Sequence, residues 1–356
     1  MHKVRVLFLP PIDADNTNAQ SLNTREIALR LDQNRFECTL WYEREPDRRL
    51  LNRPEIRLLQ LPARRKTLRL LREMLAGYDI ISYIDYSPAS YIFVHLPRMI
   101  RGKTRAFFHA EAPSAQIVNP SRSLRFLYEG IFPNCDCYSA ITEFVGEDVF
   151  RRIGKRVAHI LPVGVDIGMF SPGRERQNQA PVVLFAGTVI ERKGPQYVLE
   201  AAANFPAAEF LIVGAARGGF DQILRAKIRE LQLKNVVLKG PKTQAELLDI
   251  MRSSDIFILP SRLEGMPKVS LEAAATGLPS IVFRDYQTPS VLDGVTGFQV
   301  GSSGEMMQAL GRLIADPASR SRMGIAAREL AQKYDWNLVS QVWQKAFLEL
   351  AGRHGE

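Results

Sequence analysis

Short runs of apolar, β-branched and aromatic residues alternate with segments of helical periodicity from the start of the 356-residue chain. The first such pair is the run VRVLFLP and the segment SLNTREIALRL, and the runs FECTLWY, YDIISYID, TRAFFHA and CDCYSAIT follow. Alternation of strands and helices predicts a parallel sheet with right-handed crossovers. The first part of the chain therefore predicts an α/β domain with a doubly wound sheet.

A polar segment rich in Pro and Gly interrupts this alternation between Pro162 and Pro181. The alternation then restarts, with the runs VVLFAG, AEFLIVG, NVVLKG, DIFILP and PSIVF. A chain of this length has room for two cores, and the composition of the interrupting segment is typical of a linker. We expect a first domain at residues 1–165, a second doubly wound domain at 166–335 and a C-terminal helix at 336–356.

Two amphipathic segments add to this picture. The C-terminal helix should pack against a core through apolar residues at helical spacing, namely Trp336, Val339, Val342, Trp343, Phe347 and Leu350. A basic segment combines the cations of Arg64, Arg65, Lys66, Arg69 and Arg72 with the apolar residues Leu68, Leu71, Met74 and Leu75. This segment predicts either an ordinary surface helix or a helix that lies on an anionic membrane.

Composition narrows the class of protein. A hydrophobic content of 46% and a charged content of 24% are typical of a globular protein, and no apolar run approaches the roughly 18 residues of a membrane span. The start of the chain meets charge and proline too early for a signal peptide, so we expect a cytoplasmic protein. Cys38, Cys135 and Cys137 lack the spacing of a zinc site, and we expect reduced thiols.

The formal net charge of +9 favours an anionic partner, which can be a phosphate, a nucleic acid or an acidic membrane surface. The basic residues are spread along the chain, and no zinc finger or aromatic-rich RNA-binding motif accompanies them. We therefore expect a phosphate-bearing ligand and no nucleic acid. The basic segment leaves peripheral contact with the inner face of an anionic membrane open as a further expectation.

The run SRLEGMPKVSLE has the features of a ligand-binding helix start. Pro267 suits the first helical turn, and Gly265 removes a side chain where the backbone would approach a ligand. The backbone N–H groups of Met266, Lys268 and Val269 lie at the positive end of the helix dipole. Together these features predict an anion site that suits a diphosphate.

Two glutamates flank this helix start, Glu264 in the preceding loop and Glu272 inside the helix. Carboxylates accept hydrogen bonds from hydroxyl groups, so the pair suits a ribose or a hexose beside the phosphate. The alternative is that both glutamates only stabilise the N-terminus of the helix electrostatically.

The run FAGTVIERKGP predicts a second anion site at the same edge of the second sheet. Gly187 follows a strand, Arg192 and Lys193 offer cations, and Pro195 suits the first turn of the next helix. Ligands of open α/β sheets bind beyond the carboxyl ends of the strands, where Gly240 also falls. The alternative is a pair of solvated charges on a surface loop.

The order and spacing of these runs resemble the C-terminal half of glycosyltransferase family 4, a group 1 family with the GT-B fold. The resemblance extends from Pro162 to Val300 and includes the runs PVGVDIGMFSP, FLIVG and DGVTGFQV. It implies two Rossmann-like domains that face each other across a cleft, with the C-terminal helix crossing back to the first domain. It also implies a retaining hexosyltransferase that needs no metal or cofactor. Such an enzyme moves a sugar from a nucleoside diphosphate sugar to a hydroxyl group of a glycan, a lipid-linked saccharide or a small molecule.

The resemblance assigns roles to individual residues. It implies a donor site formed by Gly187, Arg192, Lys193, Gly240, Lys242, Glu264, Gly265, Met266, Pro267, Lys268, Val269 and Glu272. Glu272 is expected on the ribose, Glu264 near the hydroxyls of the transferred sugar, and Lys193 at the diphosphate. Gly240 and Lys242 are expected at the base.

His109, in the run FFHAEAP, resembles the family's histidine that faces the reaction centre, and it completes an expected catalytic set with Glu264 and Lys193. A histidine after an apolar run is alternatively a hydrogen-bonded structural residue. Glu111, Asp13 and Asp15 are alternatives for contacting the acceptor hydroxyl.

Two departures from the family pattern change these expectations. Thr188 stands where members often have Arg, so Arg192 is expected to share the neutralisation of the phosphates with Lys193. The loop PPIDADNTNAQS after the first strand lacks the usual pair of glycines, which leaves the acceptor geometry open.

Other classes of protein remain as alternatives. A GT-B-fold epimerase or phosphorylase would share the fold, a glycosidase would use the paired acids on water, and a non-catalytic module would only bind the sugar nucleotide. An NAD-dependent oxidoreductase is excluded, because no strand is followed by the G-x-G-x-x-G run that such enzymes use.

Overall fold

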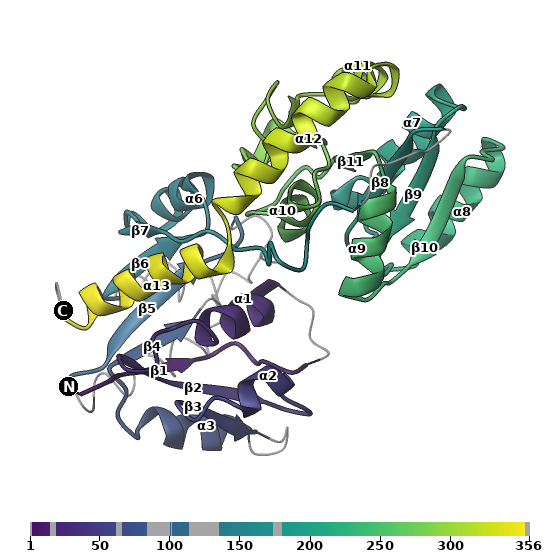
Figure 1. Cartoon of the computed structure of the whole chain (residues 1–356). Helices are drawn as coiled ribbons and strands as arrows, with labels where there is room; N and C mark the ends of the chain where they lie inside the picture. The colour runs from purple at the N-terminus through teal and green to yellow at the C-terminus, as the bar shows by residue number, and fades with distance from the viewer. Residues whose placement is uncertain are drawn as a thin grey trace. The chain divides into compact units, whose positions relative to one another are not determined.

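The computed structural model describes residues 2–14, 19–61, 66–83, 100, 102–113, 135–173 and 180–352. The chain divides into two compact units; in Figure 1 the first is coloured purple to blue with a yellow helix, and the second teal to yellow-green. The first unit comprises Met1–Val163 and Trp336–Glu356, and the second comprises Gly164–Asp335. The division between residues 163 and 164 lies beside the boundary at 165 and 166 that the sequence suggests, and the C-terminal helix groups with the first unit.

The first unit is built on a seven-stranded parallel sheet with the strand order β3-β2-β1-β4-β5-β6-β7. Its strands are β1 (Val4–Phe8), β2 (Phe36–Tyr42), β3 (Ile56–Gln60), β4 (Ile80–Tyr83), β5 (Arg105–Ala110), β6 (Cys137–Ala140) and β7 (His159–Ile160). Its described helices are α1 (Ala19–Ala28), α2 (Arg48–Leu51), α3 (Lys66–Met74), α6 (Glu143–Ile153) and α13 (Trp336–Leu350). The pattern predicted β1, β2, β4, β5 and β6, but it gave no signal for β3 or for the two-residue strand β7.

Helix α13 completes the core of the first unit. Phe347 is fully buried and lies edge to face against Phe8 of β1 and Phe107 of β5, with ring centroids 5.9 Å and 5.0 Å away. Aromatic pairs in this geometry add to the free energy gained from burial. Val342 differs from the expectation, since 44% of its surface is exposed, so the buried face of α13 is narrower than the apolar pattern suggests.

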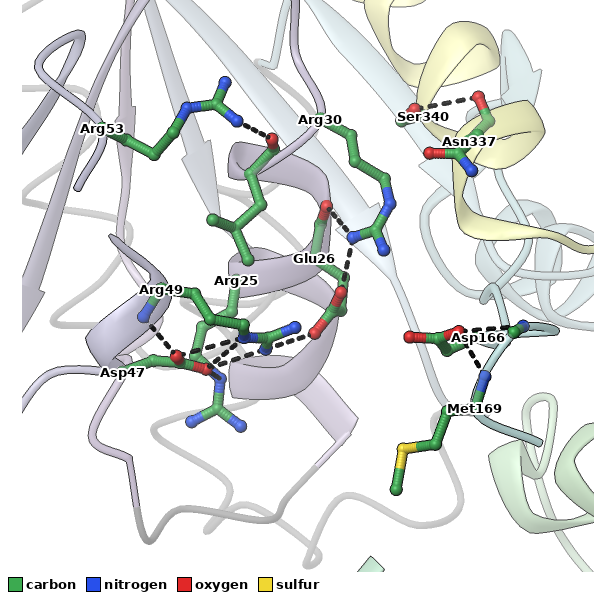
Figure 2. Close-up of polar contacts among 12 residues, drawn as sticks. Arg25, Glu26, Arg30, Asp47, Arg49, Arg53, Asp166, Met169, Asn337 and Ser340 are labelled. Atoms are coloured by element: carbon green, nitrogen blue, oxygen red, sulfur yellow. Dashed lines mark hydrogen bonds and ion pairs between the residues drawn. The ribbon is translucent and has the colours of Figure 1, made fainter. Parts of the chain in front are cut away.

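Helix α1 is held in place by a network of charges, shown in Figure 2. The guanidinium of Arg49 on α2 lies 2.6 Å from the Glu26 carboxylate on α1 and 2.8 Å from Asp47. Arg25, which is buried, donates a hydrogen bond to the backbone carbonyl of Asp13 at 2.6 Å. Because α1 is tied to both α2 and the loop after β1, the residues on its inner face have fixed positions.

The second unit is built on a six-stranded parallel sheet with the strand order β10-β9-β8-β11-β12-β13. Its strands are β8 (Val182–Ala186), β9 (Glu209–Val213), β10 (Val236–Gly240), β11 (Ile256–Leu259), β12 (Ser280–Phe283) and β13 (Gly297–Val300). Its helices are α7 (Pro195–Asn204), α8 (Phe220–Glu230), α9 (Gln244–Ser253), α10 (Lys268–Ala275), α11 (Ser303–Ala315) and α12 (Pro317–Gln332). This doubly wound order confirms the expected α/β class.

The described residues of the segment expected to be a linker pack against the second unit. Phe170 is buried, and the guanidinium of Arg328 on α12 donates to the carbonyls of Phe170, Ile167 and Ala275 at 2.6–2.9 Å. Buried carbonyls with charged donors are fixed parts of a core. Residues 164–173 therefore belong to the second unit. The polar composition of the segment gave no sign that Phe170 would be buried.

The basic segment forms helix α3, whose orientation differs from the expected one. Met74 is buried as expected, but Leu70 is buried as well, and Leu68 has 55% of its surface exposed. Arg64 and Arg65 lie outside the described residues. No described helix is long and apolar enough to cross a membrane. Contact with a membrane surface stays a prediction.

Candidate functional site

The loops that follow β8, β9 and β11 pass so close to one another that their backbones are in contact. A Cβ atom on Gly214 would lie 1.8 Å from the carbonyl oxygen of Gly187, and one on Gly194 would lie 2.2 Å from that of Pro260. Gly194 also has a left-handed backbone with φ of 77°, which glycine adopts at little cost. These close approaches bring the loop that carries Lys193 against the loop that follows β11.

Glu264 is the centre of a cluster formed by those two loops. Its Oε1 atom lies 2.9 Å from Lys193 Nζ and 3.4 Å from Arg192 Nη1, and it accepts a hydrogen bond from Ser261 Oγ at 2.7 Å. The Arg192 guanidinium also donates to the carbonyl of Leu263. Lys193 and Glu264 are largely buried, so their attraction is screened little by solvent. The sequence placed both cations at a phosphate, whereas in the structure they pair with Glu264.

The helix that follows begins one residue later than expected. Pro267 is the N-cap rather than a residue of the first turn, α10 starts at Lys268, and no side chain caps its N-terminus. Gly277, with φ of 73°, lies just beyond the end of the helix. The uncapped N-terminus therefore presents backbone N–H groups and the positive end of the helix dipole.

Glu272 is buried one turn into α10. Its carboxylate lies 3.8 Å from Lys268 Nζ and makes no hydrogen bond to the residues that the structure describes. Burial raises the pKa of Glu272, and the charge of Lys268 opposes this shift. A buried carboxylate with hydrogen-bonding capacity to spare suits a ligand that donates hydroxyl hydrogens.

Tyr286, in the 3-10 turn that follows β12, was not predicted. Its side chain is fully buried, and its hydroxyl has no hydrogen-bond partner within the described ranges. Burial raises the pKa of Tyr286, and the nearby charge of Glu264 raises it further. Gln287 next to it has a left-handed backbone with φ of 46°, which is uncommon outside glycine. Tyr286 stands between the polar residues Asp285 and Gln287, so the sequence gives no sign that its side chain is buried.

Gly240 and Lys242, both expected at the base, are separated by the structure. Gly240 lines a cavity of about 130 Å³ together with Gly214, Asp221 and Arg225. Lys242 is exposed, and its ammonium lies 2.9 Å from Glu246 on the first turn of α9. The cavity thus keeps Gly240 in the candidate site, while Lys242 belongs to a surface ion pair beside it.

The expected catalytic histidine lies in the other unit. His109 is 2% exposed at the end of β5, its Nδ1 atom is 3.1 Å from Ser139 Oγ, and its ring packs edge to face on Trp343. Burial lowers the pKa of His109 to about 3, so the imidazole is neutral. This geometry is that of a hydrogen-bonded, buried histidine, which the sequence left open as the alternative to a catalytic one.

The residues considered for the acceptor have distinct environments. The carboxylate of Asp13 accepts hydrogen bonds from the backbone N–H groups of Glu43 and Arg44, so it shapes the loop after β1. Glu111 accepts from the Asn23 amide at 2.8 Å. Asp15 lies outside the described residues. Among described side chains, no three His, Cys, Asp or Glu residues gather closely enough to hold a metal ion.

The second unit matches a known family. Residues 170–330 match the family model described as glycosyl transferases, group 1. The second unit is therefore a group 1 glycosyltransferase domain. The chain is also 30% identical over 262 residues to a D-inositol 3-phosphate glycosyltransferase of Corynebacterium jeikeium, a match that covers 66% of this chain and 62% of that protein. The matched regions span about half to three fifths of the length of such relatives.

Solved structures extend the likeness of the group 1 domain to the whole chain at the level of the fold. Sucrose-phosphate synthase of Thermosynechococcus elongatus superposes with a TM-score of 0.83 at 18% identity and covers 99% of this chain and all of that one. Anabaena HepE in complex with UDP superposes with a TM-score of 0.79 at 17% identity over 98% of this chain and all of that one. The two Rossmann-like units therefore have the GT-B fold.

Proposed function

We propose that the chain transfers a sugar from a nucleoside diphosphate sugar to a hydroxyl acceptor, with retention of configuration and without a metal ion. The observation that carries this proposal is the cluster of Lys193, Arg192 and Glu264 beside the uncapped N-terminus of α10. Cations and a helix N-terminus attract a diphosphate, and carboxylates accept hydrogen bonds from sugar hydroxyls. The family match and the complex of HepE with UDP support this choice of donor.

The donor would be divided among the residues of the second unit. Lys193, Arg192 and the backbone of residues 265–269, with Gly187 close by, would hold the diphosphate and the start of the sugar. Glu272 would accept from the ribose hydroxyls, and the cavity beside Gly240 would take the base. To contact the phosphates, Lys193 and Arg192 would have to give up part of their ion pairs with Glu264. The Glu264 carboxylate would then be available to the sugar.

The chemistry that these groups favour is charge stabilisation. The bond between the sugar C1 and the diphosphate oxygen breaks, and a bond from C1 to the acceptor oxygen forms on the same face of the ring. The acceptor proton passes to the leaving phosphate. Negative charge grows on the leaving group in an oxocarbenium-like transition state. Lys193 and Arg192 would stabilise that charge, and electrostatic stabilisation of this kind is commonly the largest single contribution to catalysis.

Binding measurements test the donor site directly. Isothermal titration of the full chain with UDP, GDP and ADP, followed by their sugar conjugates, should identify one nucleotide that binds. Lys193→Ala and Glu272→Ala should each weaken that nucleotide at least about tenfold, because each removes a charged contact. Glu264→Gln should reduce the rate of sugar transfer more than it reduces binding of the nucleotide.

Surface variants in the same unit serve as controls. Lys227→Ala and Glu230→Gln break an exposed ion pair on α8 and should leave nucleotide affinity unchanged. Unchanged affinity in both Lys193→Ala and Glu272→Ala would remove the proposed donor site. Phosphorolysis of a glycoside without any nucleotide would instead favour a GT-B phosphorylase. The names of the relatives make inositol phosphates the first acceptors to assay.

A further inference from the structure

A small cavity lies in the first unit, whereas the donor residues belong to the second. Its volume is about 10 Å³, which is the room of about one water molecule. Six of its lining side chains are polar. Two are the hydroxyl residues Thr24 of α1 and Ser82 of β4, and the other four are Asn23 of α1, His109 and Glu111 at the end of β5, and Trp343 of α13. We call it the four-residue cavity.

Each of these four side chains has one polar atom without a partner. The atoms are Asn23 Oδ1, His109 Nε2, Glu111 Oε2 and Trp343 Nε1, and none of them has a hydrogen-bond partner in the described part of the chain. Asn23, His109 and Trp343 are at most 5% exposed. A buried polar group without a partner costs roughly 1–3 kcal/mol, so four around one cavity call for a ligand.

The hydrogen bonds around His109 define its tautomer. Ser139 Oγ lies 3.1 Å from the carbonyl oxygen of Phe108, and this carbonyl can only accept. We assign the single hydroxyl hydrogen of Ser139 to this bond, which makes His109 Nδ1 the donor to Ser139 Oγ at 3.1 Å. Nε2 of the neutral ring then carries no hydrogen. His109 presents a lone pair to the cavity.

The remaining groups complete a pattern of donors and acceptors. The Trp343 indole N–H can only donate, whereas Asn23 Oδ1 can only accept. Asn23 Nδ2 donates to Glu111 Oε1 at 2.8 Å, which fixes the orientation of both side chains. A group that accepts one hydrogen bond and donates another matches this arrangement, and a bare anion or a group that only accepts does not.

We propose that the four-residue cavity is a binding site for one hydroxyl group, supplied by a polyol or, in its absence, by an ordered water. The oxygen accepts from the Trp343 indole N–H, and the hydrogen is donated to His109 Nε2 or Asn23 Oδ1. A cavity of this size takes a single hydroxyl and leaves the rest of a polyol outside it. The site neither contains nor requires any donor residue of the second unit, so it does not rest on the proposed nucleotide site.

Nuclear magnetic resonance of the full chain labelled with ¹⁵N-tryptophan tests this site without any sugar nucleotide. The chain has three tryptophans, and the indole cross-peak of Trp343 is assigned by its loss in Trp343→Phe. Glycerol and myo-inositol are the probes. We expect a saturable shift of the Trp343 indole cross-peak with at least one of them. Trp41 is the internal control, because its indole N–H already donates to the carbonyl of Leu9 at 2.6 Å and should not move.

The two sources of the hydroxyl give different results. A saturable shift of Trp343 alone supports a polyol site. No shift, together with a nuclear Overhauser contact between the Trp343 indole proton and a long-lived water, supports the same site with water as its occupant. Absence of both the shift and the water contact overturns the proposal, whatever the outcome of the nucleotide titrations.

Variants of the cavity sharpen the test. His109→Phe retains an aromatic ring against Trp343 but removes the Nε2 acceptor. The affinity for the polyol, read from the shift of the Trp343 cross-peak, should fall about tenfold. Val342→Ala, on the exposed face of the same helix as Trp343, should leave the titration unchanged. If His109→Phe does not fold, the titration of the wild-type chain still decides the question.

Discussion

The two units prepare for ligands in opposite ways. Around Glu264 in the second unit the charged groups are already paired, since its carboxylate contacts Lys193, Arg192 and Ser261. In the first unit the groups around the four-residue cavity are largely neutral, and each has an unpartnered atom. An unpaired buried charge costs far more free energy than an unpaired neutral group. The charged groups of the second unit therefore need partners within the protein, whereas the neutral groups of the first unit can remain without them. Binding in the second unit therefore means an exchange of partners, and in the first unit a gain of partners.

The largest expected effect separates the stabilities of the two units. Phe347→Ala removes a fully buried ring that contacts Phe8, Phe36 and Phe107, and it should destabilise the first unit by about 3–5 kcal/mol. Hydrogen exchange read by mass spectrometry should show loss of protection in β1 and β5 and unchanged protection in β8 and β11. Val342→Ala on the same helix should change stability by less than about 0.5 kcal/mol. Equal loss of protection in both units would show that they unfold together.

A second effect falls on the loops of the donor site. Gly194→Ala adds a Cβ atom 2.2 Å from the Pro260 carbonyl oxygen at a φ of 77°, and it should cost the second unit more than about 3 kcal/mol. Gly218→Ala is the matched control, because its φ is 61° but no atom lies within 4 Å of the added Cβ. The control should cost only about 1–2 kcal/mol. Denaturant titration measures both variants, and similar losses would argue against the close approach of the two loops.

The pH dependence of stability should come from the first unit. Burial raises the pKa of Glu111 to about 7, so the native chain binds a proton there that the unfolded chain releases near 4.5. The penalty is absent below pH 4.5 and complete above about pH 7, and stability falls as the pH rises between them. Glu111→Gln removes this penalty and should gain on the wild type by about 1–3 kcal/mol between pH 5 and pH 8.

Thermal unfolding at several pH values measures this difference. Glu305→Gln, on an exposed carboxylate paired with Arg284, is the control and should show no such trend. A constant difference between Glu111→Gln and the wild type from pH 5 to pH 8 would contradict the raised pKa.

The smallest expected effect is a difference in the direction of the stability change between two Tyr→Phe variants. Tyr78→Phe removes a hydroxyl of the first unit that hydrogen-bonds to Thr39 Oγ1 at 3.1 Å and to the Glu73 carboxylate, and it should cost about 1–2 kcal/mol. Tyr286→Phe removes the unpartnered hydroxyl of the second unit and should be neutral or stabilising by up to about 1 kcal/mol. Chemical denaturation measures both, and a clear loss in Tyr286→Phe would mean that its hydroxyl has a partner.

Periodicity predicted the α/β class well, because parallel strands buried on both faces read as continuous apolar runs. It could not predict β3, whose outer residues are partly exposed, or the anchoring of Phe170 within a polar segment. These features depend on contacts that are distant in the sequence. The Arg328 side chain, for example, lies more than 150 positions from the carbonyls that it binds at Ile167 and Phe170.

The sequence indicated the loops that carry the candidate donor residues, but it did not indicate how their charges pair. Glycines and a proline between charged residues indicated the loops around Lys193 and Glu264, since these residue types have narrow conformational uses. That the charges would pair with each other, and that Lys242 would pair with Glu246 instead, depends on side-chain geometry. Asn23 and Trp343 gave no sign of a ligand site, because each stands in an ordinary helical pattern, and Tyr286 stands among polar residues that gave no sign of its burial.

The order in which the chain is synthesised gives α13 a further importance. The first unit is assembled from Met1–Val163 and Trp336–Glu356, so the whole second unit leaves the ribosome before α13 does. The second unit can complete its core during synthesis, although domains closer to the N-terminus usually fold first. Until α13 is synthesised, the rings that Phe347 contacts, namely Phe8, Phe36 and Phe107, lack this partner. Their apolar surface is then exposed, and chaperones recognise such surface.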